Sequence, residues 1–345
     1  MAGTGSSHLP FVPTPRQTIE SHAQVLREID NRSWLLARVI ISRHSSKPSS
    51  GRFWGDGEGG FFAISVAPHP PPLTREVSAP CPITPIFYRG ALWGTWRIGL
   101  CELRIEGCAG TPEHVTLKAL KKGKDETTPW TFKIPRVYYH AQHGDFYYIA
   151  YSLLPGKSLC EVWPKIEDDA FKERIVRQIA QAYGELSTWR GEKICGVDGN
   201  DLLELYLGTG GRLEECCSPQ ELRDNCEEIG MDCSDLVFAH NNLRPHSFSV
   251  DENGLVGISR WEDSGYVPRD WVRTKTLVNV FLYGRSCDTA WSEEQQHEWY
   301  EKINRALSEL KVGDKAFGEK RSQFLKWNIK KHEELFGPNP SKYFS

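Results

Sequence analysis

The sequence lacks the features that would assign it at once to a large functional class. No apolar run approaches the roughly 20 residues that a membrane helix needs. The first residues, MAGTGSSHLPFVPTP, lack the basic start and apolar stretch of a secretory signal. The net charge is only −3, which gives no electrostatic reason to expect nucleic acid or an anionic membrane as a partner. These absences predict a cytoplasmic protein with neither kind of partner.

Metal-binding and redox patterns are also missing. The chain has ten cysteines but no C-x-x-C pair, and no Cys/His cluster has zinc-ligand spacing. Without a signal sequence, reduced thiols are expected. We therefore expect no metal site and no cofactor.

What the chain does have is length and aromatic residues. Its 345 residues, 39% of them hydrophobic, are enough for two lobes or domains. Twelve tryptophans make it rich in this residue. Most of them are expected in core packing, with one or two lining a pocket for a flat or apolar ligand.

Composition and periodicity predict four segments. Residues 1–16 read as a disordered tail, and residues 17–85 as an N-terminal extension with a helix and a linker rich in Pro and Gly. Residues 86–155 read as a β-rich N-lobe, and residues 156–345 as a helical C-lobe. The fold class expected is α+β.

Local patterns give the elements. Alternating aromatic and β-branched residues predict strands over 86–107, at HVTLKAL and over 145–154. Apolar stripes predict helices over 168–190, 218–231 and 291–336. LVFAH reads as one short strand, and SFSVDENGLVGIS reads as two short strands joined by a DENG turn.

Several motifs together resemble the fungal branch of the aminoglycoside-phosphotransferase-like family. They are P-R-V-Y, PG-x-x-L-x-x-x-W, H-x-x-L-x-P and GI-x-x-WE-x-x-G-x-x-P, and they lie between about residues 130 and 280. The resemblance implies a protein-kinase-like fold with a small β-rich lobe and a larger helical lobe. Family members with the full motif set phosphorylate hydroxyl groups of small molecules.

This chain departs from the family at the residues that carry the chemistry. In the family's H-x-D-x-x-x-x-N loop, His240 matches, Asn242 takes the position of the base and Ser247 that of a metal ligand. Arg260 takes the position of the metal-binding aspartate. Phosphoryl transfer depends on positioning and on charge neutralisation by a metal. An amide accepts no proton and a guanidinium repels Mg²⁺, so the motifs are degenerate.

The same segments gain groups that suit other chemistry. Guanidinium and imidazole groups can bind an anionic or enolisable ligand without a metal, and a histidine near its titration range can carry a proton. We expect catalytic roles for Asn242, His246, Arg260 and His240, and substrate contacts from Arg244, Ser247, Glu262 and Asp263. The simpler alternatives are that His240 holds the backbone, that Arg260 forms a structural ion pair, and that His246 is exposed.

The nucleotide-binding elements are doubtful. Lys118, in the expected strand HVTLKAL, is the candidate phosphate lysine, with a surface lysine as the alternative. The helix that should supply its glutamate partner looks shortened or missing, and Glu126 is the only glutamate after Lys118 in this region. GDGEGG (55–60) fits G-x-G-x-x-G, but its acidic residues would repel phosphate, so we interpret it as a turn.

Three functions remain open. The first is a small-molecule enzyme that has lost kinase activity and catalyses a metal-free cyclisation, isomerisation or elimination in fungal specialised metabolism. The second is a non-catalytic pseudokinase-type binding or scaffold protein with a protein partner. The third is a small-molecule hydroxyl kinase with relocated groups such as Asp251 or Asp263.

Overall fold

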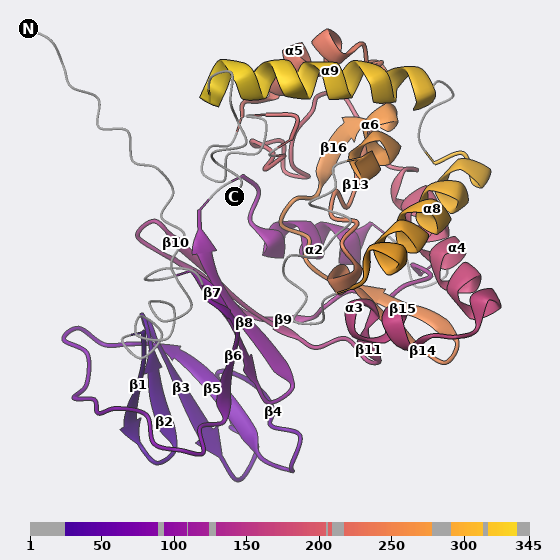
Figure 1. Cartoon of the computed structure of the whole chain (residues 1–345). Coiled ribbons are helices and arrows are strands. Elements are labelled where there is room, and N and C mark those ends of the chain that lie inside the picture. Colours follow the sequence, from indigo (N-terminus) through magenta and orange to yellow (C-terminus); the bar gives the residue numbers. More distant parts are fainter. Residues whose placement is uncertain are drawn as a thin grey trace, which may run out of the picture. The chain divides into compact units, whose positions relative to one another are not determined.

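A computed structural model of the chain describes most of its length. The described residues are 25–88, 93–108, 110–123, 129–204, 206–208, 217–277, 291–312 and 317–336. They form two compact units, which we treat separately (Figure 1). Unit 1 comprises Met1–Cys108 and Arg136–Leu153, and unit 2 comprises Ala109–Pro135 and Leu154–Ser345. The expected tail over 1–16 and Glu126 lie outside the described residues.

Unit 1 begins with a five-stranded antiparallel sheet in the order β1-β2-β3-β5-β4. Its strands are Leu26–Asp30, Ser33–Leu36, Val39–His44, Arg52–Gly55 and Phe61–Val66, for β1 to β5 in turn. The helix expected within 17–85 is therefore wrong for the described residues, and β4 and β5 occupy part of the expected linker, whereas no helix or strand lies between Val66 and Ile83. The strands have four to six residues each, so their alternation lasts too briefly to be distinguished from a helical stripe.

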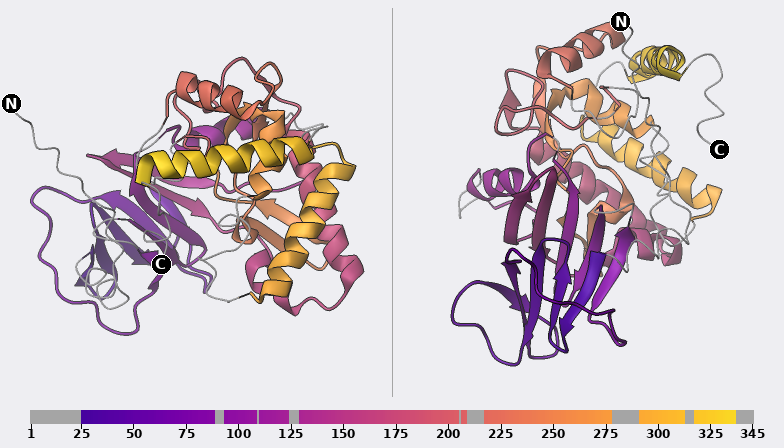
Figure 2. Two further views of the ribbon diagram at one scale, coloured as in Figure 1. Left: turned by 45° about the horizontal axis from the view of Figure 1, so that its top comes forward. Right: turned by 90° about the vertical axis from the view of Figure 1, so that its left-hand side faces the viewer.

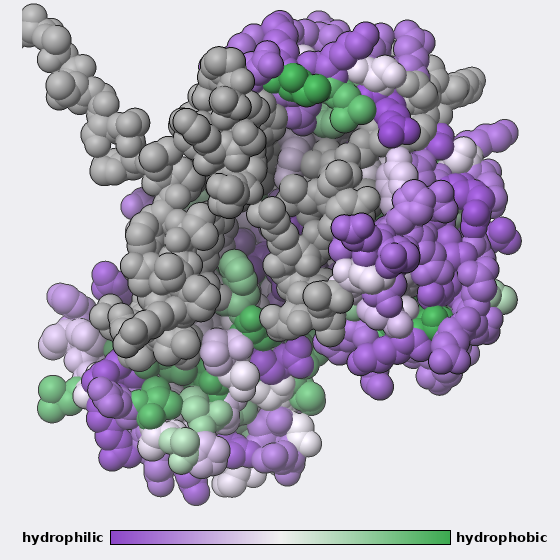
Figure 3. Space-filling view, in the orientation of Figure 1, coloured by the Kyte–Doolittle hydropathy of each residue, from purple (hydrophilic) through white to green (hydrophobic). Residues whose placement is uncertain are grey.

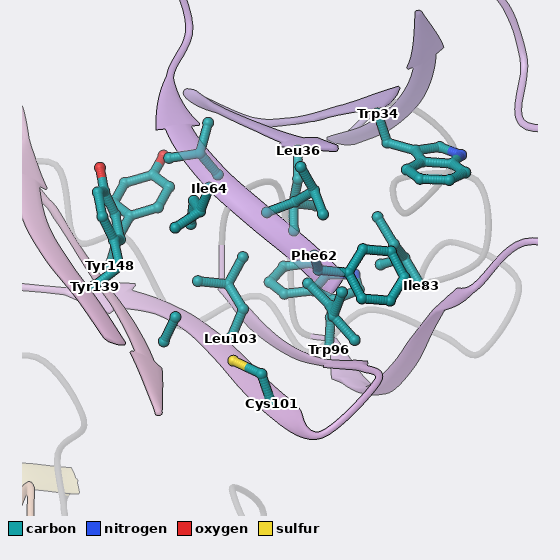
Figure 4. Close-up of a cluster of buried hydrophobic side chains, with 14 of the residues drawn as sticks. Trp34, Leu36, Phe62, Ile64, Ile83, Trp96, Cys101, Leu103, Tyr139 and Tyr148 are labelled. Carbon is teal, nitrogen blue, oxygen red and sulfur yellow. The ribbon is translucent and has the colours of Figure 1, made fainter. Parts of the chain in front are cut away.

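A second antiparallel sheet completes unit 1, in the order β6-β7-β8-β10-β9. Its strands, β6 to β10, are Ile83–Tyr88, Gly94–Ile98, Cys101–Gly107, Val137–His143 and Phe146–Ser152. Buried side chains of both sheets form one hydrophobic core, including Leu36 and Phe62 from the first sheet and Trp96 and Leu103 from the second (Figure 4). The segment over 25–66 is thus part of the core of unit 1 and does not form a separate extension.

Helix α2 (Glu113–Lys122) replaces the strand expected at HVTLKAL. The β-branched Val115 and Thr116 suggested a strand, but Thr116, Leu117 and Leu120 lie on one buried face at helical spacing. Glu113 in the first turn and lysines in the last turn complement the helix dipole. Of the stretch after Lys118 in which a helix with a glutamate partner was expected, residues 119–122 belong to α2, whose glutamate, Glu113, precedes Lys118.

The long helices of unit 2 follow the predicted pattern. They are α4 (Asp169–Leu186), α5 (Pro219–Ile229), α8 (Glu293–Glu309) and α9 (Phe317–Phe336). Asp168 caps α4, and capping boxes start α5 and α8. Helices α4 and α8 lie side by side (Figure 2), joined by Lys302, whose ammonium contacts Asp169 at 2.7 Å and Glu173 at 2.6 Å.

Short strands and helices fill the rest of unit 2. One three-stranded sheet has the order β11-β14-β15 (Lys157–Ser158, Phe248–Asp251, Gly254–Ile258). The other has the order β12-β13-β16 (Arg190–Gly191, Leu236–Ala239, Gly265–Pro268). Helices α3 (Leu159–Val162) and α6 (Arg269–Thr274) lie beside these sheets. Both sheets place their loops where the degenerate motifs occur.

The surfaces of the two units differ in polarity. The visible surface of unit 2 is mostly hydrophilic, whereas hydrophobic residues gather on the visible face of unit 1 (Figure 3). No helix among the described residues is long and apolar enough to cross a membrane. Seven described cysteines are free thiols, but Cys160 is disulfide-bonded, so the expectation of reduced thiols is wrong there.

Replacing Ile41 tests whether the first sheet belongs to the core. Ile41, on β3, is fully buried. Ile41→Ala should lower the free energy of unfolding by about 2–5 kcal/mol, because it removes buried methyl groups and leaves a cavity. Leu73→Ala, at a position that is 96% exposed, is the matched control and should change little. Urea unfolding measures both, and equal effects would show that the first sheet adds no core.

Candidate functional site

The candidate site lies on two loops of unit 2. One loop follows β13, runs from His240 to Arg244 and continues into a short 3₁₀ turn, Pro245–Ser247. The other follows β15 and runs from Ser259 to Ser264 before β16. Because β13 pairs with β16 and β14 pairs with β15, the two loops are held against each other at both ends.

His240 is the central link between these loops. Its ring is fully buried, and its Nε2 lies 2.8 Å from the carbonyl oxygen of Ser259. The Nδ1 atom lies 3.2 Å from the Tyr183 hydroxyl of α4. Burial lowers the pKa of His240 to about 4, so the ring is neutral, donates from Nε2 to the carbonyl and accepts at Nδ1. This geometry supports the alternative that His240 positions the backbone.

Three further hydrogen bonds fix the loops. The Asn241 side-chain amide donates to the Asp263 carbonyl at 3.1 Å, and the Ser264 hydroxyl donates to the His240 carbonyl at 3.1 Å. The Ser259 N–H donates to the Ser247 carbonyl at 2.9 Å. The loops are therefore tied at both ends, with Ser247 directly beside the residue that precedes Arg260.

Cationic and neutral groups surround His246. Burial lowers its pKa well below the usual value, and the guanidinium groups of Arg260 and Arg244 lower it further. The expectation that a histidine here titrates near neutrality is therefore wrong, because both His240 and His246 are held neutral. His246 is half-buried, not exposed as its alternative reading proposed.

Buried polar atoms along the first loop lack partners among the described residues. They are the Asn241 Oδ1, the His246 Nδ1 and the Ser247 Oγ. A buried polar group without a hydrogen bond costs about 1–3 kcal/mol, so three in one loop mark a place where a ligand can supply partners. The backbone is also strained here, since Asn241 (φ 56°) and Arg260 (φ 64°) both have left-handed conformations.

The second loop carries two acidic residues, Glu262 and Asp263. Burial raises the pKa of Asp263 to about 7, and the carboxylate of Glu262 raises it further, while Lys275 opposes the shift. Lys275 itself pairs with the buried Glu204 at 2.6 Å. Asp263 is therefore the group near these loops that titrates at neutral pH. The sequence placed it among substrate contacts and gave no sign of this property.

Asn242 has a local structural contact. It is buried, and its Oδ1 lies 3.4 Å from the backbone nitrogen of Arg244, which donates to it. The amide therefore helps to hold the turn that carries Arg244. An amide at this position has no proton-accepting carboxylate, whatever else it contacts.

The Mg²⁺ that the resemblance implies does not fit these residues. Mg²⁺ prefers carboxylate and water oxygens, but the three motif positions carry an amide, a hydroxyl and a guanidinium. Within the described ranges, no group of three His, Cys, Asp or Glu residues could hold a metal ion.

The structure corrects the role expected for Lys118. This residue lies on the exposed side of α2, not on a strand, because the buried face of the helix is formed by Thr116, Leu117 and Leu120. Sequence reasoning also missed Glu113, which begins α2. Its carboxylate accepts a hydrogen bond from the Trp261 N–H at 2.8 Å, so α2 is attached to the second loop of the site.

GDGEGG is a structural turn, as interpreted. It joins β4 to β5. The Asp56 carboxylate accepts from the N–H groups of Glu58 and Gly60, each at 2.8 Å, and Arg43 binds both Asp56 and Glu58 at 2.7 Å. The acidic groups of the turn are therefore satisfied within it.

The chain was compared with family models, curated proteins and solved structures. No family model and no curated protein matches the chain. Among solved structures, the chain is similar to APH(2")-IIa with streptomycin and ATP (12% identity, 76% of this chain, 88% of that chain, TM-score 0.43). It is also similar to APH(2")-IIIa with GDP and kanamycin (15% identity, 78% of this chain, 92% of that chain, TM-score 0.44). A third similar structure is APH(4)-Ia with AMP-PNP and hygromycin B (13% identity, 76% of this chain, 88% of that chain, TM-score 0.45).

These solved structures are aminoglycoside phosphotransferases. The expected α+β class, with β-rich sheets in the N-terminal part and a helical C-terminal part, is confirmed by the described helices and strands themselves. At these identities and TM-scores the likeness carries no statement about the substrate or reaction of this chain.

The stability of an Asp263→Asn variant tests the protonation of Asp263. Its pKa is raised from 3.8 to about 7 on folding, so ionisation costs the folded state increasingly between pH 4 and 7. The free energy of unfolding of the variant should therefore rise relative to that of the wild type by roughly 1 kcal/mol for each pH unit over this range. His240 acts in the opposite sense: its pKa is lowered from 6.5 to about 4, so its contribution to stability is lost as pH falls between those values.

Unfolding by urea at pH 4, 5.5, 7 and 8 measures this difference. Glu252→Gln, which changes an exposed carboxylate of the β14–β15 turn, is the matched control. Its free energy of unfolding should change with pH as that of the wild type does. A constant offset for Asp263→Asn across the whole range would mean that Asp263 ionises normally.

Proposed function

We propose that this chain is a catalytically diverged phosphotransferase-like protein whose unit 2 loops bind a small molecule without a metal. The observation that carries the proposal is the charge of the site. A permanent cation, Arg260, lies on a loop that is hydrogen-bonded to the loop of the neutral Asn242 and Ser247, and polar atoms of Asn241, His246 and Ser247 lack partners among the described residues. Such a site favours an anionic or enolisable ligand over a magnesium–nucleotide complex.

The same residues could support proton transfer. Arg260 and Arg244 can stabilise developing negative charge, as a metal would do in a kinase. Asp263, with a pKa of about 7, is half ionised near neutral pH and is the best candidate for a general acid or base. His240 and His246 then act by position and hydrogen bonding, because both are neutral. Charge stabilisation by the arginines and proton transfer by Asp263 are the two functions that a cyclisation, isomerisation or elimination requires.

Other features extend the proposal. In protein kinases the phosphate-binding lysine lies on the third strand of the β-rich lobe. The third strand of the second sheet is β8, which carries the buried Arg104, paired with Glu106 at 3.0 Å. We propose that no lysine serves this role here.

The motif resemblance to fungal proteins makes specialised metabolism the context that we favour.

Titration with Mg·ATP tests the proposal. The wild type should show no magnesium-dependent binding by isothermal titration calorimetry. A variant that restores the family motif, Asn242→Asp with Ser247→Asn and Arg260→Asp, should gain binding that depends on Mg²⁺, because it removes the cation and supplies two carboxylates. Arg260→Gln, which removes only the cation, is the matched control and should gain little.

Magnesium-dependent binding of ATP by the wild type would contradict the proposal and revive a hydroxyl kinase with relocated groups. Circular dichroism of each variant establishes that it is folded. If the folded motif-restored variant shows no magnesium-dependent binding, the three positions do not control metal binding.

A further inference from the structure

Unit 1 contains a cavity of about 430 Å³ that the proposed function does not use. It lies where β4 and β9 come together, and each of these is the outermost strand of its sheet. Its size falls within the range of small-molecule pockets. All of its lining residues belong to unit 1, so the cavity is complete within one compact unit.

Aromatic rings form much of the wall. Trp54 is 2% exposed, and its indole N–H donates to the Ile98 carbonyl at 2.7 Å, which fixes the ring. Trp54 stacks on Tyr138 with ring centres 5.7 Å apart. Phe53 and Phe61 also line the cavity and meet edge to face at 6.1 Å. A flat ring entering the cavity therefore meets a prearranged aromatic wall.

Three cations line the cavity, and each lies over an aromatic ring of unit 1. Lys47 lies over Phe53 at 5.6 Å and Arg136 over Tyr138 at 5.6 Å, while Arg52 lies over Tyr139 at 5.2 Å. All three are exposed, and none forms an ion pair with a carboxylate within the described part of unit 1. A contact with a ring face leaves N–H donors available for an anion.

Acidic groups are absent from the cavity wall. The nearest acidic turn, GDGEGG, has its two carboxylates bound by Arg43, and neither Asp56 nor Glu58 is a lining residue. The wall therefore presents positive charge and aromatic surface without a compensating negative group. This combination is specific for one class of ligand, because an uncharged ring would leave the cations unused and a cation would be repelled.

We propose that this cavity binds a small planar aromatic molecule that carries an anionic group. The ring contacts the partly exposed side chains of Phe53, Phe61 and Tyr138, which Trp54 supports from beneath, and the anion contacts Arg52 and Arg136, with Lys47 adding charge. The proposal is independent of the site in unit 2. A chain that fails to bind Mg·ATP, or one that binds it, leaves this cavity unchanged.

Isothermal titration of the full chain with 2-naphthoate tests the proposal, with 2-naphthalenemethanol as the neutral partner of the same shape. Naphthoate should bind with at least tenfold higher affinity than the alcohol. The double variant Arg52→Gln with Arg136→Gln should lose at least tenfold in affinity for naphthoate and little for the alcohol. Both positions are exposed, so the variant should fold.

Two controls separate this site from others. Arg38→Gln removes an exposed arginine of unit 1 that does not line the cavity, and it should bind as the wild type does. Arg177→Gln, which changes an exposed arginine of α4 in unit 2, should also bind normally. Equal affinity for naphthoate and the alcohol, unchanged binding by the double variant, or loss on Arg177→Gln would each overturn the proposal. So would the absence of binding at millimolar naphthoate.

Discussion

The hydrogen bond from the His240 ring to the Ser259 carbonyl is the interaction on which the site depends. It joins the loop after β13 to the loop after β15, and the neutral ring also accepts from Tyr183 on α4. Because burial holds the pKa of His240 at about 4, this link persists at any pH above that value. The Glu113 carboxylate then attaches α2 to Trp261, the residue that follows Arg260. The side chains of the site are positioned by this buried framework.

Within the framework, the distribution of charge decides what can bind. Arg260 has a left-handed backbone conformation and a permanent charge where the resemblance implies a metal-binding carboxylate. Its field, together with that of Arg244, helps to keep His246 neutral. In the second loop, burial and Glu262 keep Asp263 protonated until about neutral pH. Under the proposed function, such a scaffold would keep positioning and electrostatic stabilisation, but the ligand that it stabilises would be an anion in place of a metal complex.

Much of unit 2 could be predicted from the sequence, because its helices are long and have strong apolar stripes and caps. The ranges expected for two of them, 168–190 and 218–231, begin at the residues that cap α4 and α5, Asp168 and Ser218. The first sheet could not be predicted, since strands such as β2 and β4 have only four residues each. Helix α2 was missed because β-branched residues near its start outweighed the spacing of Leu117 and Leu120.

The candidate site was found in outline but not in its chemistry. The motif spacing located the two loops, because short hairpins place nearby residues together. The protonation states could not be predicted, since they depend mainly on burial and also on charges elsewhere in the chain: Asp263 responds to Glu204 and Lys275, and His240 to Glu262 and Lys275. Sequence alone therefore favoured the histidines as proton carriers, whereas in the folded protein it is the pKa of a carboxyl group that lies near neutrality.

The central claim is that the residues at 242, 247 and 260 leave no place for a divalent metal. The most direct test is electron paramagnetic resonance of Mn²⁺ titrated into the wild-type protein with a non-hydrolysable ATP analogue. The account predicts a spectrum identical to that of the Mn²⁺–nucleotide complex without protein. A protein-bound Mn²⁺ signal that disappears in a Ser247→Ala variant would contradict it.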